Sequence, residues 1–158
     1  MLEISELISS IAILYAIIPC IYVIIARTTA SVVWAAVVLL TPYAVKLIKS
    51  WTIQYPYSEF KRPEGARNCN MWMNNGDQSG AAGFPSGHVA TTAAFWAGAW
   101  VLAGPDHSTR VLIVGIMATA GMAWARMQMR CHTELQTVVG ALLGTLVGSG
   151  AVAAIVKK

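Results

Sequence analysis

The sequence predicts an all-α membrane protein: a polytopic bundle of about five transmembrane helices in one domain of 158 residues. Hydrophobic residues make up 56% of the chain and charged residues only 11%, well below the quarter that is usual in soluble proteins. The chain contains several uncharged stretches whose lengths approach the roughly 20 helical residues needed to cross a bilayer. We expect spans at residues 7–26, 28–50, 88–104, 110–126 and 133–156.

The first two expected spans form a tight helical pair, because only Arg27 separates their apolar stretches. A secretory signal peptide could imitate the first span. However, its apolar stretch exceeds the roughly 7–15 residues of such a peptide, and it follows Glu3 and Glu6 rather than basic residues. We therefore interpret it as a helix of the mature protein. The fourth span is short, and we expect Arg110 and Arg126 to snorkel from its ends.

Five spans divide the connecting segments between the two sides of the membrane. One side, called the loop side below, holds the N-terminus, a loop at residues 51–87 and a turn at 127–131. The opposite side holds Arg27, a turn at 105–110 and the Lys157-Lys158 pair. Loops beyond about 12–15 residues are usually functional or disordered, and this loop contains specific proline, asparagine and glycine turn signals. We therefore expect it to carry function.

The basic residues do not settle which side is cytoplasmic. The opposite side has four, and the loop side has Lys46, Lys49, Lys61, Arg62, Arg67, Arg126 and Arg130. Lys49, Arg62 and Arg126 are better explained by the motifs below, and discounting them leaves four on each side. The net charge of +4 is spread over span ends and one loop, without a basic stripe, so we expect no nucleic-acid partner.

The segment Pro85-Ser86-Gly87-His88 stands immediately before the third expected span. Free backbone N–H groups and the helix dipole favour an anion at a helix N-terminus. Ser86 can cap the helix or bind a phosphate oxygen, and Gly87 lets the backbone approach a ligand closely. His88 can hold a proton for a leaving group. Alone, these residues would favour an ordinary capped helix with an interfacial histidine.

Arg126 and His132 flank the next turn on the loop side, and Gln136 follows one helical turn after His132. An arginine close to a histidine, beside a second histidine at a helix end, is what phosphoryl transfer through a phosphohistidine needs. Arg126 would neutralise the phosphate oxygens while His132 attacks phosphorus. Arg62-Pro63 adds an arginine on an extended backbone. Lys49 ends the second span, where snorkelling alone also accounts for a lysine.

These elements resemble the motifs of the type 2 phosphatidic acid phosphatase superfamily, which read Lys-x6-Arg-Pro, Pro-Ser-Gly-His and Ser-Arg-x5-His-x3-Asp. The second motif matches in full, Arg126 and His132 have the right spacing, and the resemblance covers roughly residues 46–148. It implies that His132 attacks phosphorus and that His88 protonates the leaving group and then activates water. It also implies that the phosphate oxygens are held by Lys49, Arg62, Ser86, the Gly87 amide and Arg126.

The chain departs from the family pattern at the first and third motifs. Tyr55 stands where the first motif has lysine, so we expect Lys49 to serve instead, with Lys46 as the alternative. Ala125 replaces the motif serine, which removes one hydrogen bond to phosphate but no charge.

Gln136 stands where the third motif has aspartate, so it can orient His132 but cannot stabilise an imidazolium with a charge. The segment His132-Thr133-x-x-Gln136 is similar to the His-Thr-x-x-Gln of dolichyl diphosphate phosphatases in the same superfamily. This similarity favours polyprenyl diphosphate substrates.

We therefore expect a membrane phosphatase that hydrolyses a lipid phosphate or polyprenyl diphosphate through a phosphohistidine, with the lipid substrate and the bilayer as its partners. The resemblance implies no metal and no cofactor, and Glu59, Glu64 and Asp77 show no metal-ligand spacing. One alternative is a catalytically weak or silent lipid-phosphate-binding protein, motivated by Gln136 and the displaced lysine. Another is a vanadate-binding haloperoxidase, against which five spans argue.

Family members generally have six spans and a site outside the cytoplasm. The resemblance therefore implies that one N-terminal helix is missing here, that the loop side is lumenal or extracytoplasmic, and that Lys157-Lys158 is cytoplasmic. Cys69 and Cys131 both lie on the loop side, and the sequence leaves open whether they form a disulfide or two free thiols.

Gly140, Gly144 and Gly148 form a ridge of small residues along the last span. We expect this ridge to let a neighbouring helix of the same chain pack closely, with dimerisation through the ridge as the alternative.

Overall fold

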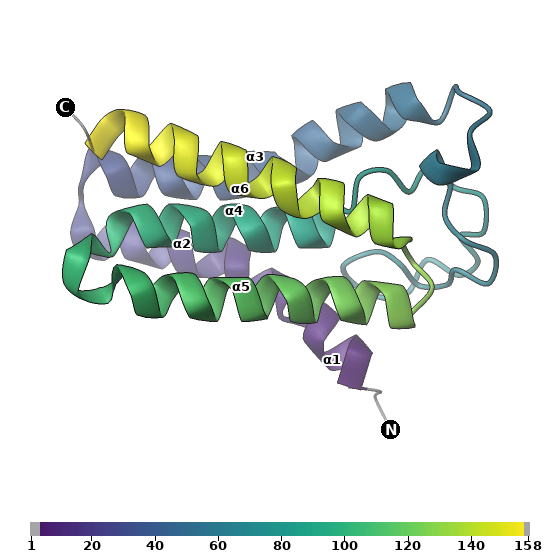
Figure 1. The fold of residues 1–158 in the computed structure, drawn as a ribbon, viewed down its shortest axis with the longest axis horizontal. Helices are drawn as coiled ribbons and strands as arrows, with labels where there is room; N and C mark the ends of the chain where they lie inside the picture. Colours follow the sequence, from purple (N-terminus) through teal and green to yellow (C-terminus); the bar gives the residue numbers. More distant parts are fainter. Residues whose placement is uncertain (1–3, 157–158) are drawn as a thin grey trace.

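The computed structural model of the chain describes residues 4–156, so the expectations that concern Glu3 and Lys157-Lys158 lie outside the described residues. The chain forms a bundle of helices with one long loop at one end (Figure 1). In order, the elements are α1 (Ile4–Ser10), α2 (Ala12–Ala26), α3 (Thr29–Thr52), η1 (Ser58–Phe60), α4 (Gly87–Leu102), α5 (Gly104–Gln128) and α6 (Glu134–Val156).

The bundle is that of a multi-pass membrane protein. Within the described residues, α1 with α2, α3, α5 and α6 are each long and apolar enough to cross a bilayer. The third expected span, α4, has 16 residues and lies between the other helices (Figure 1). The first expected span is a pair of helices, α1 and α2, interrupted at Ile11.

The turns between helices follow from a few residues. Arg27 adopts a left-handed conformation with φ 50°, which ends α2, and the side chains of Thr28 and Ser31 form a capping box that starts α3. The expected turn at 105–110 is wrong, because α5 begins at Gly104. Gly104 has a φ of 68°, which lets the chain turn directly out of α4, and Pro105 suits the first helical turn because its missing N–H is not needed there.

The glycine ridge of α6 packs on α4 within the chain. A Cβ atom at Gly140 would lie 2.7 Å from the Ser86 carbonyl oxygen, and Gly144 and Gly148 face the backbone of α4 in the same way. All three glycines are buried. Small side chains on α4, such as Ala90, complete this close approach.

The loop between α3 and α4 is folded back on itself. Isolated antiparallel bridges pair Lys61 with Ala82 and Arg67 with Asp77. Cys69 and Cys131 form a disulfide with an S–S distance of 2.04 Å, which joins the loop to the turn between α5 and α6. The loop, that turn and α1 all lie at the same end of the bundle (Figure 1), as the count of five spans predicts.

Candidate active site

The Pro85–His88 segment turns the chain from the loop into α4. The Phe84–Pro85 peptide bond is cis, and Ser86 is the N-cap of α4 with extended backbone angles. The Ser86 side chain makes no capping hydrogen bond, although its Oγ is buried. Its backbone N–H instead donates to the Gln136 carbonyl of α6 at 2.9 Å. The hydroxyl is therefore not used for holding the helix.

Gly87 begins α4 and lines a cavity at the loop side of the bundle. A Cβ atom built at this position would meet nothing closer than the Val45 side chain at 3.5 Å, an ordinary contact. The fold therefore does not itself require glycine here. A close approach of a ligand to the backbone would require it.

The cavity holds about 380 Å³ and brings together residues from α3, the loop, α4 and the α5–α6 turn. Lys49, Arg62, His88 and His132 all line it. Lys46 lines it as well, but its side chain is exposed, whereas Lys49 is half-buried. The charge of Lys49, unlike that of Lys46, is one of those that lower the pKa of His132, which favours Lys49 as the lysine of the site.

His132 is held by Gln136. The His132 Nδ1 and Gln136 Oε1 atoms lie 2.9 Å apart, and Gln136 Nε2 donates to the carbonyls of Glu59 at 2.8 Å and Lys61 at 2.7 Å. A carbonyl oxygen can only accept a hydrogen bond, so the two loop carbonyls must face the NH₂ end of the Gln136 amide. The oxygen must therefore face His132, and Nδ1 carries the proton that it accepts. The lone pair of His132 is consequently on Nε2, the nitrogen suited to nucleophilic attack.

His132 is almost completely buried, with 3% of its surface exposed. Burial is the main reason why the pKa of His132 lies well below its ordinary value of 6.5, and the positive charges of Lys49, Arg62 and Arg126 lower the pKa further. The hydrogen bond with Gln136 raises the pKa, but less. His132 is therefore neutral at pH 7, as a nucleophile must be.

The two arginines are anchored by uncharged groups. Arg126 is fully buried and donates from Nη1 to the Ser9 hydroxyl and from Nη2 to the Cys69 carbonyl, both at 2.6 Å. Arg62 donates from Nη1 to the Cys131 carbonyl at 3.0 Å. Burial lowers the pKa of Arg62 to about 10, which still leaves it cationic at neutral pH. Two fixed cations thus stand beside the histidines.

Most of the polar side-chain atoms that are buried without a hydrogen-bond partner belong to this region. Over residues 4–156 these atoms are Arg62 Nε, Ser86 Oγ, His88 Nε2, Arg126 Nε and Trp96 Nε1. Each such atom costs about 1–3 kcal/mol when left unpaired. The first four are two guanidinium donors, a hydroxyl and an imidazole nitrogen, which is a set that an oxyanion with several oxygens can satisfy together.

Asp77, one of the acidic loop residues, stabilises a turn of the loop. Asp77 accepts from the backbone N–H of Ser79 at 2.9 Å and from its hydroxyl at 2.8 Å, which lowers the pKa of the Asp77 carboxyl. Among residues 4–156, no three His, Cys, Asp or Glu side chains gather as a metal site would need.

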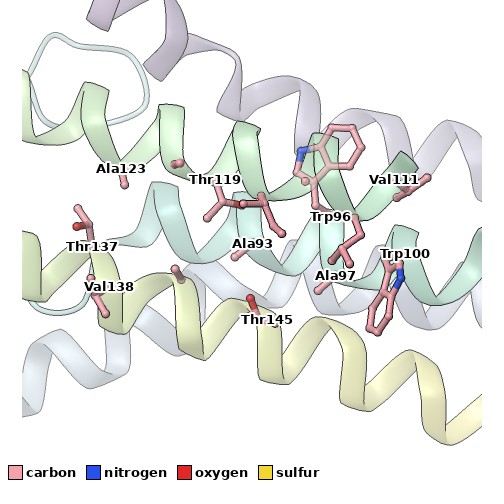
Figure 2. Close-up of a pocket in the computed structure, with 15 residues that line it drawn as sticks. Ala93, Trp96, Ala97, Trp100, Val111, Thr119, Ala123, Thr137, Val138 and Thr145 are labelled. Carbon is pink, nitrogen blue, oxygen red and sulfur yellow. The ribbon is translucent and has the colours of Figure 1, made fainter. Parts of the chain in front are cut away.

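An apolar groove between α5 and α6 lies on another face of α4 (Figure 2). Trp96, Trp100 and Val138 contribute to its walls, and no titratable side chain lines it. The two cavities use different faces of α4, because Ala93 and Ala97 point to the groove whereas His88 and Thr91 line the cavity with the histidines. The groove therefore offers no acid or base.

The sequence-predicted site residues gather at one end of the bundle, but the sequence did not indicate several groups that hold them. Ser9, the carbonyls of Cys69 and Cys131, and the carbonyls of Glu59 and Lys61 all anchor site side chains. Backbone carbonyls carry no residue-type signal. A serine in an apolar helix is equally uninformative without its partner.

Comparison with protein-family models matches residues 31–158 to the PAP2 superfamily. The matched segment begins within α3 and contains every lysine, arginine, serine, glycine, glutamine and histidine of the predicted site. It leaves out α1 and α2, and with them Ser9. Searches of curated proteins and of solved structures gave no significant match.

Proposed function

The chain belongs to the PAP2 superfamily, and we propose that it is a membrane phosphatase that hydrolyses a lipid phosphate or a polyprenyl diphosphate through a phosphohistidine on His132. The observation that carries the proposal is the set of unpaired polar atoms on Arg62, Ser86, His88 and Arg126. Arg62 and His88 line the cavity that His132 also lines, Ser86 directly precedes its lining residue Gly87, and the charge of Arg126 acts on both histidines. A phosphate group in this cavity would give each of these atoms a partner.

In the proposed first step, His132 Nε2 attacks phosphorus and the bond from phosphorus to the leaving oxygen breaks. The electron pair goes to that oxygen, which takes a proton from His88 Nε2. Arg62, Arg126, Lys49, the Ser86 hydroxyl and the Gly87 N–H hold the remaining phosphate oxygens as their charge develops.

In the second step, water attacks the phosphohistidine while His88 removes its proton. The nitrogen–phosphorus bond breaks, inorganic phosphate leaves, and His132 recovers its lone pair. Gln136 keeps the imidazole oriented throughout, through the bond from His132 Nδ1.

The walls of the cavity support a lipid rather than a soluble substrate. Besides the charged side chains, Ala12, Pro42 and Val45 line it. Pro42 lies two helical turns before Lys49, about 10 Å deeper along α3, in a helix that is long and apolar enough to span the bilayer. A phosphate held at Lys49 would therefore place an attached hydrocarbon chain against apolar wall.

The disulfide supports a lumenal or extracytoplasmic site, because disulfides form and persist in oxidising compartments. Cys69 is buried in the disulfide, so orientation needs a new thiol. Glu64→Cys, exposed on the loop, in a Cys20→Ser background should react with a membrane-impermeant reagent on intact cells. If the new thiol reacts only after the cells are opened, the loop side lies in the cytoplasm instead.

Phosphate release by the purified full chain in detergent tests the function. Phosphatidic acid, lysophosphatidic acid and a polyprenyl diphosphate form the substrate panel. We expect release from at least one of them, reduced on the order of 10⁴-fold in His132→Ala. His107→Ala is the matched control and should leave activity unchanged, since His107 is exposed in the first turn of α5, whereas the site lies at the other end of that helix. Absence of His132-dependent release from all three substrates would favour a silent phosphate-binding protein.

A further inference from the structure

The two site arginines are anchored on the two residues of the disulfide. Arg126, at the end of α5, donates to the carbonyl of Cys69 in the loop. Arg62, in the loop, donates to the carbonyl of Cys131 in the turn after α5. Each arginine therefore binds the cysteine of the other chain segment, and the S–S bond closes this crossed pair.

The anchors determine where the unpaired edges of the arginines point. A guanidinium is planar, so fixing its Nη groups on a carbonyl also fixes the direction of its Nε–H. The Nε atoms of both arginines are the ones left buried without a partner. The carbonyls of Cys69 and Cys131 thus hold the outer edge of each guanidinium while Nε remains available for an anion.

The two cysteines lie apart from the hydrophobic core of the helix bundle. Cys69 and Cys131 are buried in a small cluster with Ala66, separate from the hydrophobic clusters of the helix bundle. The N–H groups of Cys131 and His132 both donate to the Arg126 carbonyl, at 3.0 Å and 3.3 Å. A shift of Cys131 would therefore move the carbonyl that holds Arg62, and it would move the neighbouring His132 as well.

We propose that Cys69 and Cys131 are positioning residues, whose disulfide aims Arg62 and Arg126 at the phosphate group. This inference rests on the proposed function, because it assigns the anion to the cavity of His132. Neither cysteine side chain takes part in the chemistry. The loop keeps a second attachment, the two hydrogen bonds from Gln136 to Glu59 and Lys61, so loss of the disulfide should loosen the arginines without releasing the whole loop.

The test compares the full chain with a Cys69→Ala/Cys131→Ala variant in detergent, using inorganic phosphate as the ligand and calorimetry for its Kd. We expect phosphate to bind at least about tenfold more weakly, which corresponds to about 1.4 kcal/mol. Cys20→Ala, which removes the exposed free thiol of α2, is the matched control and should bind normally. Equal binding by the disulfide variant would overturn the proposal.

A second experiment distinguishes a positioning disulfide from a merely structural one. Arg62→Lys and Arg126→Lys are each added to the wild-type chain and to the Cys69→Ala/Cys131→Ala variant. If the disulfide acts through the arginines, each lysine substitution should weaken phosphate binding much less once the disulfide is gone. Strictly additive losses would show that the disulfide acts elsewhere and would contradict the proposal.

If the alanine variant does not fold, the folded wild-type chain can be treated with a dithiol until mass spectrometry finds both Cys69 and Cys131 as free thiols. The S–S bond then breaks, two electrons and two protons pass to the sulfurs, and the dithiol becomes a cyclic disulfide. Weaker phosphate binding that returns on reoxidation supports positioning, and unchanged binding overturns it. A chain that binds phosphate but releases none from lipids would end the proposed function alone, whereas a chain that binds no phosphate would end both.

Discussion

At the scale of single residues, both ends of the Gln136 amide form hydrogen bonds. Nε2 donates to the carbonyls of Glu59 and Lys61, and Oε1 accepts from His132 and from the Thr133 N–H at 3.3 Å. A carboxylate here would bring an oxygen without a proton against two carbonyl oxygens. The family motif has aspartate at this position. Glutamine suits this chain because the loop presents two carbonyl oxygens to the side chain, and only an amide can donate to them.

Gln136→Glu should consequently weaken both the fold and the reaction. Each hydrogen bond to a loop carbonyl that is lost costs about 1–3 kcal/mol, and the loop that carries Arg62 loses its attachment to α6. Thermal unfolding in detergent and phosphate release measure the two effects. Gln54→Glu, on an exposed glutamine two residues after the end of α3, is the control. A Gln136→Glu protein as stable and active as wild type would show that the carbonyl contacts do not matter.

The charge state of His132 gives a second residue-scale prediction. Because its pKa lies well below 6.5, its imidazole should stay neutral at pH 7 and gain a proton only at clearly lower pH. Arg62→Gln removes a nearby positive charge and should move this pKa upward. Ring NMR of the three histidines measures it, with His88→Asn and His107→Asn to assign the signals. Titration at 6.5 or above in the wild type would contradict the described burial.

At the scale of elements, α4 and α6 hold the two histidine motifs at a fixed spacing. The N–H of Ser86, at the start of α4, donates to the Gln136 carbonyl near the start of α6. Further along, the α6 glycines let the two backbones touch. The glycine ridge therefore controls the distance between the His88 helix and the helix that orients His132.

Gly144→Ala should push these helices apart, since its Cβ would overlap the Ala90 carbonyl and approach the Ala93 side chain to 2.9 Å. Overpacking of this kind costs about 1–3 kcal/mol, and we expect phosphate release to fall with it. Gly150→Ala, on the same helix with nothing within 4 Å of the new Cβ, should change neither the unfolding temperature nor the activity. If the two variants were equally stable and equally active, the glycine ridge would not control the distance between α4 and α6.

At the scale of the whole molecule, the protein separates a lipid-facing surface from one polar end. Large apolar side chains such as Ile24, Ile116 and Leu146 are 62–71% exposed along the outside of the helices, as a bilayer environment allows. The charged and hydrogen-bonding side chains of the site gather instead around the cavity lined by the end of α3, the loop, the start of α4 and the α5–α6 turn. A membrane phosphate would thus meet the site at the bilayer surface.

The fold and the position of the site were largely predictable from the sequence, because apolar stretches and their number are local properties. Counting spans places His88 and His132 at the same end of the bundle. The anchors of the arginines were not predictable, since Arg126 meets Ser9 across 117 positions and Cys69 across 57. The disulfide was left open because the compartment, not the spacing, decides the state of two thiols.

The most direct test of the central claim is to find the phosphoryl group on the protein. A His88→Ala variant, which lacks the base for the second step, should accumulate the intermediate when given a polyprenyl diphosphate, whose phosphate leaving group needs little protonation. Rapid quenching followed by peptide mass spectrometry should place one phosphoryl group on His132. Hydrolysis that proceeds with no phosphoryl group on His132, or with the group on another residue, would contradict the account.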